Sequence, residues 1–171
     1  MKPDIAFVFF VAISIASAVS RADDNWNQFR GPGGDGLATT ANLPIEFDES
    51  KTVRWKVAIP DSGWSSPVIW EDEIWLTTGS DEKKELHAIC IDLQTGNLKQ
   101  NIKVFDMVER KVDPAYAFDS PHLNSPATPT SFVEEDRVYV SFGSQGIACL
   151  NRQTGDKVWQ RRDLRIYQPV R

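Results

Sequence analysis

Two stretches of the chain repeat one another, and this internal repeat is the strongest constraint on the fold. Residues 89–96 read Ile-Cys-Ile-Asp-Leu-Gln-Thr-Gly, and residues 148–155 read Ala-Cys-Leu-Asn-Arg-Gln-Thr-Gly, 59 positions further on. A second pair of matching stretches contains Asp72 and Asp136, which lie 64 positions apart. Two offsets indicate equivalent strands joined by loops of different length. The pattern predicts successive copies of one unit that bury their apolar faces against each other.

Each unit of the repeat reads as short β-strands. β-branched and aromatic residues gather in short runs between Asp, Gly and Ser, and the chain after its N-terminal region shows no sustained 3.6-residue apolar period. Both features predict an all-β fold. The predicted strands are 66–70, 74–78, 86–92 and 98–105, followed by 128–133, 137–142, 146–151 and 157–162.

The two Gln-Thr-Gly sequences, at 94–96 and 153–155, indicate hairpin turns in which glycine takes a positive φ. An additional strand is predicted at 52–59, because its Val-Arg-Trp-Lys around Trp55 resembles the Lys-Val-Trp-Gln around Trp159. The strand at 52–59 resembles the fourth strand of a unit but comes before the first complete unit. This order is expected in a ring of units in which the first segment of the chain completes the last unit.

The N-terminal region is typical of a secretory signal. Lys2 precedes an apolar run from Ile5 to Val19, and cleavage after Ala22 fits best, with residues 16 and 18 as a second choice. The alternative is a retained membrane anchor. The apolar run has 15 residues, however, whereas a helix needs about 20 to span a bilayer. We therefore expect an exported protein, periplasmic or extracellular, with no membrane span after cleavage.

Residues 148–159 resemble the pyrroloquinoline-quinone-like repeat, a β-propeller blade motif that ends in Thr-Gly-Lys-x-x-Trp. Residues 26–32, 63–67 and 124–130 look like stretches of exported bacterial propeller proteins of the outer-membrane-assembly type, and the resemblance covers about residues 25–163. In that family the alanine, the glycine turn and the tryptophan dock neighbouring blades. The resemblance therefore implies structural roles for Trp55, Thr95, Gly96, Ala148, Thr154, Gly155 and Trp159.

The sequence departs from that family in two ways. Gln100 stands in the first unit where the second has Trp159, and family propellers have several blades, whereas this chain has two units and one extra strand. We expect a truncated member, with a fold of about two four-stranded antiparallel blades plus one N-terminal strand. The expected segments are a signal peptide at 1–22, a Gly- and Pro-rich extended segment at 23–51, propeller-like repeats at 52–163 (blades 66–105 and 126–163, insert 106–125) and an irregular tail at 164–171.

Two blades would leave outer sheet faces in contact with water. We expect Trp70, Trp75, Tyr139 and Phe142 on such faces, where they would form apolar patches larger than a soluble monomer usually shows. The competing explanation to a truncated product is therefore self-association, or a protein partner, at the exposed blade faces.

The sequence shows no recognisable catalytic or metal-binding constellation. Cys90 and Cys149 occupy equivalent strands of successive units, and since packed sheets lie about 10 Å apart, we expect buried thiols rather than a disulfide. His87 is expected on a strand surface. His122, in the long insert, is the better functional candidate, against a loop hydrogen-bonding role. No cofactor-binding residue can be named, and pyrroloquinoline quinone is expected only in a full-length relative.

The net charge of −5, without a basic stripe, argues against a nucleic-acid partner. The sequence favours an exported, non-catalytic propeller fragment that serves as a binding or assembly scaffold. The alternative is a fragment of a quinone-dependent oxidoreductase. A third class is a sensor module that accompanies a protein kinase.

Overall fold

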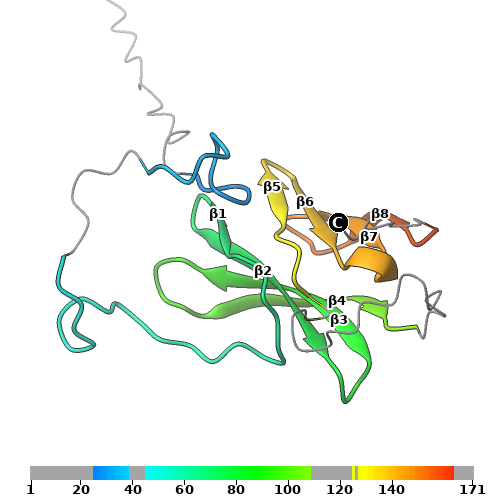
Figure 1. The fold of residues 1–171 in the computed structure, drawn as a ribbon, viewed down its shortest axis with the longest axis horizontal. Coiled ribbons are helices and arrows are strands. Elements are labelled where there is room, and N and C mark those ends of the chain that lie inside the picture. The colour runs from blue at the N-terminus through cyan, green and yellow to red at the C-terminus, as the bar shows by residue number, and fades with distance from the viewer. Residues whose placement is uncertain (1–24, 39–44, 109–124, 126, 164–171) are drawn as a thin grey trace, which may run out of the picture.

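The computed structural model describes residues 25–38, 45–108, 125 and 127–163. The predicted signal segment at 1–22, the tail at 164–171, His122 and most of the insert at 106–125 lie outside them. The described residues form two antiparallel sheets of four strands each, so the all-β prediction is confirmed (Figure 1). The strands are β1 (Val68–Trp70), β2 (Glu73–Ser80), β3 (Glu85–Asp92), β4 (Leu98–Asp106), β5 (Phe132–Glu134), β6 (Arg137–Ser141), β7 (Ile147–Asn151) and β8 (Lys157–Arg161).

Both sheets are simple meanders, with strand orders β1-β2-β3-β4 and β5-β6-β7-β8. A single 3-10 turn, η4 (Gly143–Gln145), joins β6 to β7. Strand register follows the sequence repeat position by position, because equivalent residues face one another across equivalent strands. One row crosses each sheet: Val68, Trp75, Cys90 and Gln100 in the first, and Phe132, Tyr139, Cys149 and Trp159 in the second.

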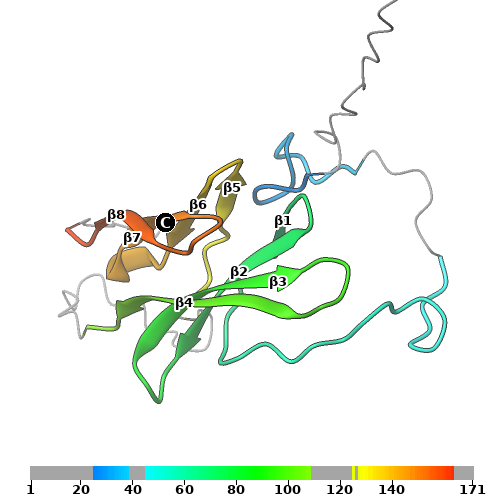
Figure 2. The same cartoon turned by 180° about the vertical axis from the view of Figure 1, so that it is seen from behind.

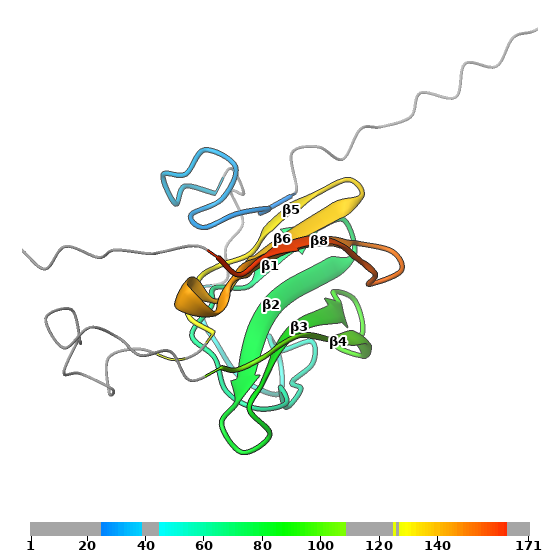
Figure 3. The ribbon, with the colours of Figure 1, turned by 90° about the vertical axis from the view of Figure 1, so that its right-hand side faces the viewer.

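The sheets lie face to face, and the hydrophobic core fills the space between them (Figures 2 and 3). Phe105 of the first sheet and Phe142 of the second meet edge to face, with ring centroids 5.9 Å apart. Each sheet is antiparallel with alternating side chains, so one face of each can be apolar and buried. The core comprises Val68, Trp75, Leu86, Ala88, Cys90, Val104, Phe105, Ala127, Val133, Val138, Val140, Phe142, Ala148 and Leu150.

Three aromatic residues expected on outer faces lie elsewhere. Trp75 and Phe142 are buried in the core, and Trp70 packs against it. The prediction was wrong because alternation along a strand shows which residues share a face but not which face meets the other sheet. Tyr139 does lie on the outer face of the second sheet, and Trp159 lies beside it.

The predicted strand at 52–59 does not form. Within the described residues, this segment pairs with no strand, and the nearest backbone pairing is an isolated bridge between Ser62 and Gly79. It instead runs as a long irregular segment beside the first sheet (Figure 1). A strand needs a partner edge for its backbone N–H and C=O groups, and β4, the outer strand of the first sheet, is not paired with it. Trp55 nevertheless contacts this sheet, as described below.

The segment around Trp26 connects the two sheets. Trp26 exchanges backbone hydrogen bonds with Ile69 of β1, and the carbonyl of Asn27 accepts one from Val133 of β5. The side-chain amide of Asn27 also donates to the Val133 carbonyl at 3.2 Å. These bonds satisfy edges of β1 and β5 that would otherwise lack partners. In the part of the chain that the structure describes, no helix has the length and apolar character to cross a membrane.

Candidate docking sites at the repeated turns

The two Gln-Thr-Gly turns have nearly the same geometry. We call residues 92–96 the first socket and residues 151–155 the second socket. In the first, the carboxylate of Asp92 accepts from the backbone N–H groups of Gln94 (3.0 Å) and Thr95 (2.8 Å), and the Gly96 N–H donates to the Asp92 carbonyl at 2.9 Å. Each of these bonds recurs in the second socket, where Asn151 replaces Asp92.

Each socket requires a glycine at its end. Gly96 and Gly155 have φ of +74° and +77°, a conformation that other residues adopt only with strain. Thr95 and Thr154 precede them, and their hydroxyls bond within the turn, to Asp92 and Asp156 respectively, both at 2.8 Å. These hydrogen bonds are all local to the two turns.

An indole ring covers the first socket. The Trp55 ring lies so close to Gly96 that a Cβ at that position would be 2.6 Å from it. The Trp55 Nε1–H donates to the Leu93 carbonyl at 3.0 Å, and the Arg54 guanidinium donates to the Gln94 side chain at 2.7 Å. Trp55 thus docks on the turn even though its segment forms no strand.

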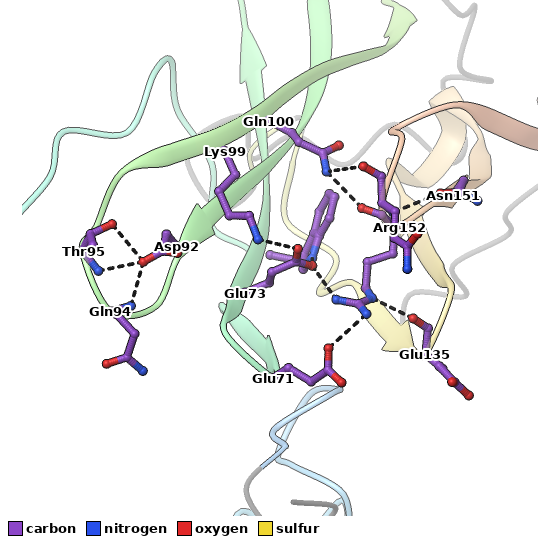
Figure 4. A network of polar contacts seen from close by, with 12 residues as sticks. Glu71, Glu73, Asp92, Gln94, Thr95, Lys99, Gln100, Glu135, Asn151 and Arg152 are labelled. Carbon is purple, nitrogen blue, oxygen red and sulfur yellow. Dashed lines mark hydrogen bonds and ion pairs between the residues drawn. The ribbon is translucent and has the colours of Figure 1, made fainter.

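Gln100 covers the second socket in the same way. Its side-chain Nε2 donates to the Arg152 carbonyl at 3.0 Å and to the Gln153 carbonyl at 3.3 Å (Figure 4). A Cβ on Gly155 would lie 2.8 Å from the Gln100 side chain. The first unit lacks a tryptophan at this position, yet Gln100 docks on the turn, because an amide donates to a turn carbonyl as an indole does.

The two contacts follow one rule. In both, a side-chain N–H donates to the carbonyl of the residue that follows the Asp or Asn, which is Leu93 in the first socket and Arg152 in the second. The donors Trp55 and Gln100 are also the residues that the repeat aligns with Trp159. Trp55 comes before the first sheet in the chain and fills the first socket. Gln100 lies on β4, before the second sheet, and fills the second socket.

A polar network also connects the two sheets (Figure 4). The buried Arg152 guanidinium bonds Glu73 at 2.8 Å, Glu71 at 3.1 Å and the Glu135 carbonyl at 2.8 Å. Glu73 also accepts from Lys99 at 2.7 Å. The Glu73 and Arg152 side chains are only 10% and 9% exposed, so each charge depends on the other for compensation.

The electrostatics of Glu73 favour its charged form. Burial alone would raise the pKa of this carboxyl, but hydrogen bonds from Lys99, Arg152 and Trp75 outweigh burial and hold the pKa below its ordinary value. The Glu73 carboxylate is therefore ionised at neutral pH. The sequence did not reveal this network, although it contains one signal. The repeat aligns Glu73 with Arg137 and Arg152 with Leu93, so neither Glu73 nor Arg152 has the same residue at the equivalent position of the other unit.

Trp159 occupies the position of Trp55 and Gln100 but contacts no socket. It lies on the outer face of the second sheet, 42% exposed, with its ring centroid 6.2 Å from that of Tyr139. Phe132, 37% exposed, continues the row at 5.9 Å from Tyr139. Ala148, the remaining repeat position, is fully buried in the core between the sheets.

Both cysteines are free and buried, as predicted. Burial raises the pKa of the Cys90 thiol to about 12 and also raises that of Cys149. His87 lies on β3, as predicted, but it is not a free surface group. Its Nδ1 lies 2.6 Å from the Asn101 side-chain oxygen and its Nε2 lies 3.3 Å from Glu85.

Metal-ligand groupings are absent from the described ranges, where no three His, Cys, Asp or Glu side chains converge. No protein-family model matches the sequence, and a search of curated proteins finds no significant match.

Proposed function

We propose that the two sheets are successive blades of a β-propeller of the pyrroloquinoline-quinone-like repeat type, and that this exported chain serves as a non-catalytic binding or assembly scaffold. The observation that carries the proposal is the repeated docking rule, in which Trp55 and Gln100 donate to equivalent carbonyls of successive sockets. A contact that recurs from one unit to the next is how repeat proteins stack.

The use of polar side chains supports a scaffold rather than an enzyme. Glu73, Lys99 and Arg152 neutralise one another between the sheets, and the carboxylate of Asp92 holds a turn. The thiol of Cys90, with its raised pKa, would be a poor nucleophile. The polar groups that the repeat brings together thus organise the interface between sheets.

Quinone binding separates the scaffold from its alternative, a fragment of a quinone-dependent oxidoreductase. The purified chain would be titrated with pyrroloquinoline quinone in the presence of Ca²⁺, with binding followed by quenching of tryptophan fluorescence. The scaffold proposal predicts no saturable quenching. Saturable binding of one quinone per chain would favour the oxidoreductase and overturn the proposal.

Export is proposed from the apolar run Ile5–Val19 that follows Lys2. Expression of the full sequence in a bacterium, followed by N-terminal sequencing of the periplasmic fraction, should give a product that begins at Asp23. A cytoplasmic product that retains residues 1–22 would contradict this part of the proposal.

A further inference from the structure

The second sheet presents an uncovered face that matches a covered face of the first. In the first sheet, the face with Trp75 and Cys90 packs in the core against the second sheet, and Gln100 extends from it to the second socket. The equivalent face of the second sheet carries Phe132, Tyr139 and Trp159, and it lies opposite the face whose Val138, Ala148 and Leu150 belong to the core. We call these three residues the aromatic row.

The occupant of such a face must carry a socket, by the docking rule. The chain itself contains a socket that Trp159 would fit, because the first socket already holds an indole through the bond from Trp55 to the Leu93 carbonyl. That indole is held by a segment outside both sheets. The same segment also meets the first sheet through the Arg54–Gln94 hydrogen bond, the bridge at Ser62 and the hydrogen bonds between Ser65 and Thr77. The last two anchor its end next to β1, whereas the Arg54 bond and the Trp55 contact hold its start.

We propose that two copies of this chain associate head to tail, with Trp159 of one copy docked in the first socket (92–96) of the other in place of that copy's Trp55. This inference rests on the proposed repeat type, in that it extends the docking rule from one sheet to the next. Trp159 then donates its Nε1–H to the Leu93 carbonyl of the second copy.

The far face of the first sheet is suited to this contact. Val138, Ala148 and Leu150 form the face of the second sheet that packs on the first. The repeat and the strand register align Val138 with Ile74, Ala148 with Ile89 and Leu150 with Ile91. The first sheet therefore carries the same kind of apolar face that already packs inside one chain. Ile89 and Ile91 are buried within the single chain. A second copy therefore meets this face only when it displaces the chain's own cover together with Trp55, and it then buries the aromatic row there.

The contact is heterologous, because a face of the second sheet meets a different face of the first. In a pair of copies, one copy still has an exposed aromatic row, and the other still has a first socket that holds its own Trp55. Further copies can therefore add at both ends until a ring closes. Association is therefore expected to depend on protein concentration.

Sedimentation velocity of the product purified from the full-length sequence tests the proposal across micromolar to millimolar concentrations. The wild-type chain should associate, Trp55→Ala should strengthen association at least tenfold by emptying the socket, and Trp159→Ala should abolish it in both backgrounds. Trp64→Ala is the matched control, because Trp64 is 56% exposed and outside both the socket and the row. It should behave as the wild type.

Two results would overturn the proposal. One is a chain that stays monomeric at every concentration, with and without Trp55→Ala. The other is association that Trp159→Ala leaves unchanged, which would mean that another surface or another occupant is responsible. If Trp55→Ala fails to fold by circular dichroism, Trp55→Phe replaces it, since the phenyl ring still covers Gly96 but has no N–H for Leu93. A monomeric result leaves the quinone titration unaffected, so the two proposals fail separately.

Discussion

At the residue scale, Gly96 and Gly155 determine how the units meet. Both have positive φ, and both lie under the side chain that docks on their turn. A Cβ at Gly96 would meet the rigid indole of Trp55, whereas a Cβ at Gly155 would meet the flexible end of Gln100. The sequence repeat located both glycines, because Gln-Thr-Gly is a turn signal that needs no tertiary information.

Gly96→Ala should destabilise the fold more than its backbone conformation alone explains. Gly34→Ala is the matched control, since Gly34 has a similar φ of +71° but nothing within 4 Å of its Cβ position. The control should cost about 1–2 kcal/mol of unfolding free energy. Gly96→Ala should cost about 1 kcal/mol more, because it displaces the Trp55 hydrogen bond. Equal losses in urea unfolding would show that Trp55 does not dock on this turn.

Glu73→Gln should destabilise the protein by about 2–4 kcal/mol at pH 7, because it leaves Arg152 buried with only the exposed Glu71 as an ionic partner. The measurement is urea unfolding at several pH values. Glu49→Gln is the control, since the Glu49 side chain is 79% exposed and its pairing with Lys56 should contribute little.

The pH dependence of this stabilisation has a definite sign. The folded state holds the pKa of Glu73 below its ordinary value of 4.5. The stabilisation is therefore complete above that value and is lost as pH falls through the lower, folded pKa. The wild type should lose more stability than Glu73→Gln between pH 6 and pH 3. Parallel curves for the two proteins would contradict the network.

At the element scale, strand existence followed from the sequence but strand partnership did not. The prediction at 74–78 lies within β2, and that at 86–92 lies within β3. The segment at 52–59 has strand-like residues and a docking tryptophan, yet it lacks a paired edge. Arg152 was missed for a related reason. Its partner Glu73 lies 79 residues away in the other sheet, and only the stacking of the two sheets brings them together.

The cysteines test the placement of β3 and β7. Both thiols are buried, and burial raises the pKa of Cys90 to about 12, so the native protein should not react with an aromatic disulfide reagent at pH 8. In denaturant, both cysteines of the chain should react. Absence of reaction under denaturing conditions would reveal a disulfide, which this arrangement of sheets excludes.

At the scale of the whole molecule, the described residues form two stacked sheets whose equivalent faces point the same way. The first sheet packs its inner face on the second, and the second presents the equivalent face outward with Trp159 in the docking position. The sequence predicted the units and their turns. It did not predict which face points inward, because either face of an alternating strand can carry apolar residues, and so three of the four residues expected outside were found in or against the core.

One docking contact is used twice in this fold, by Trp55 on Gly96 and by Gln100 on Gly155. Nuclear Overhauser spectroscopy of the labelled chain measures both contacts in one experiment. We predict cross-peaks from the Gly96 α-protons to the Trp55 ring and from the Gly155 α-protons to the Gln100 side-chain amide. A folded protein in which either cross-peak is missing would contradict the claim that both sockets are filled by the same rule.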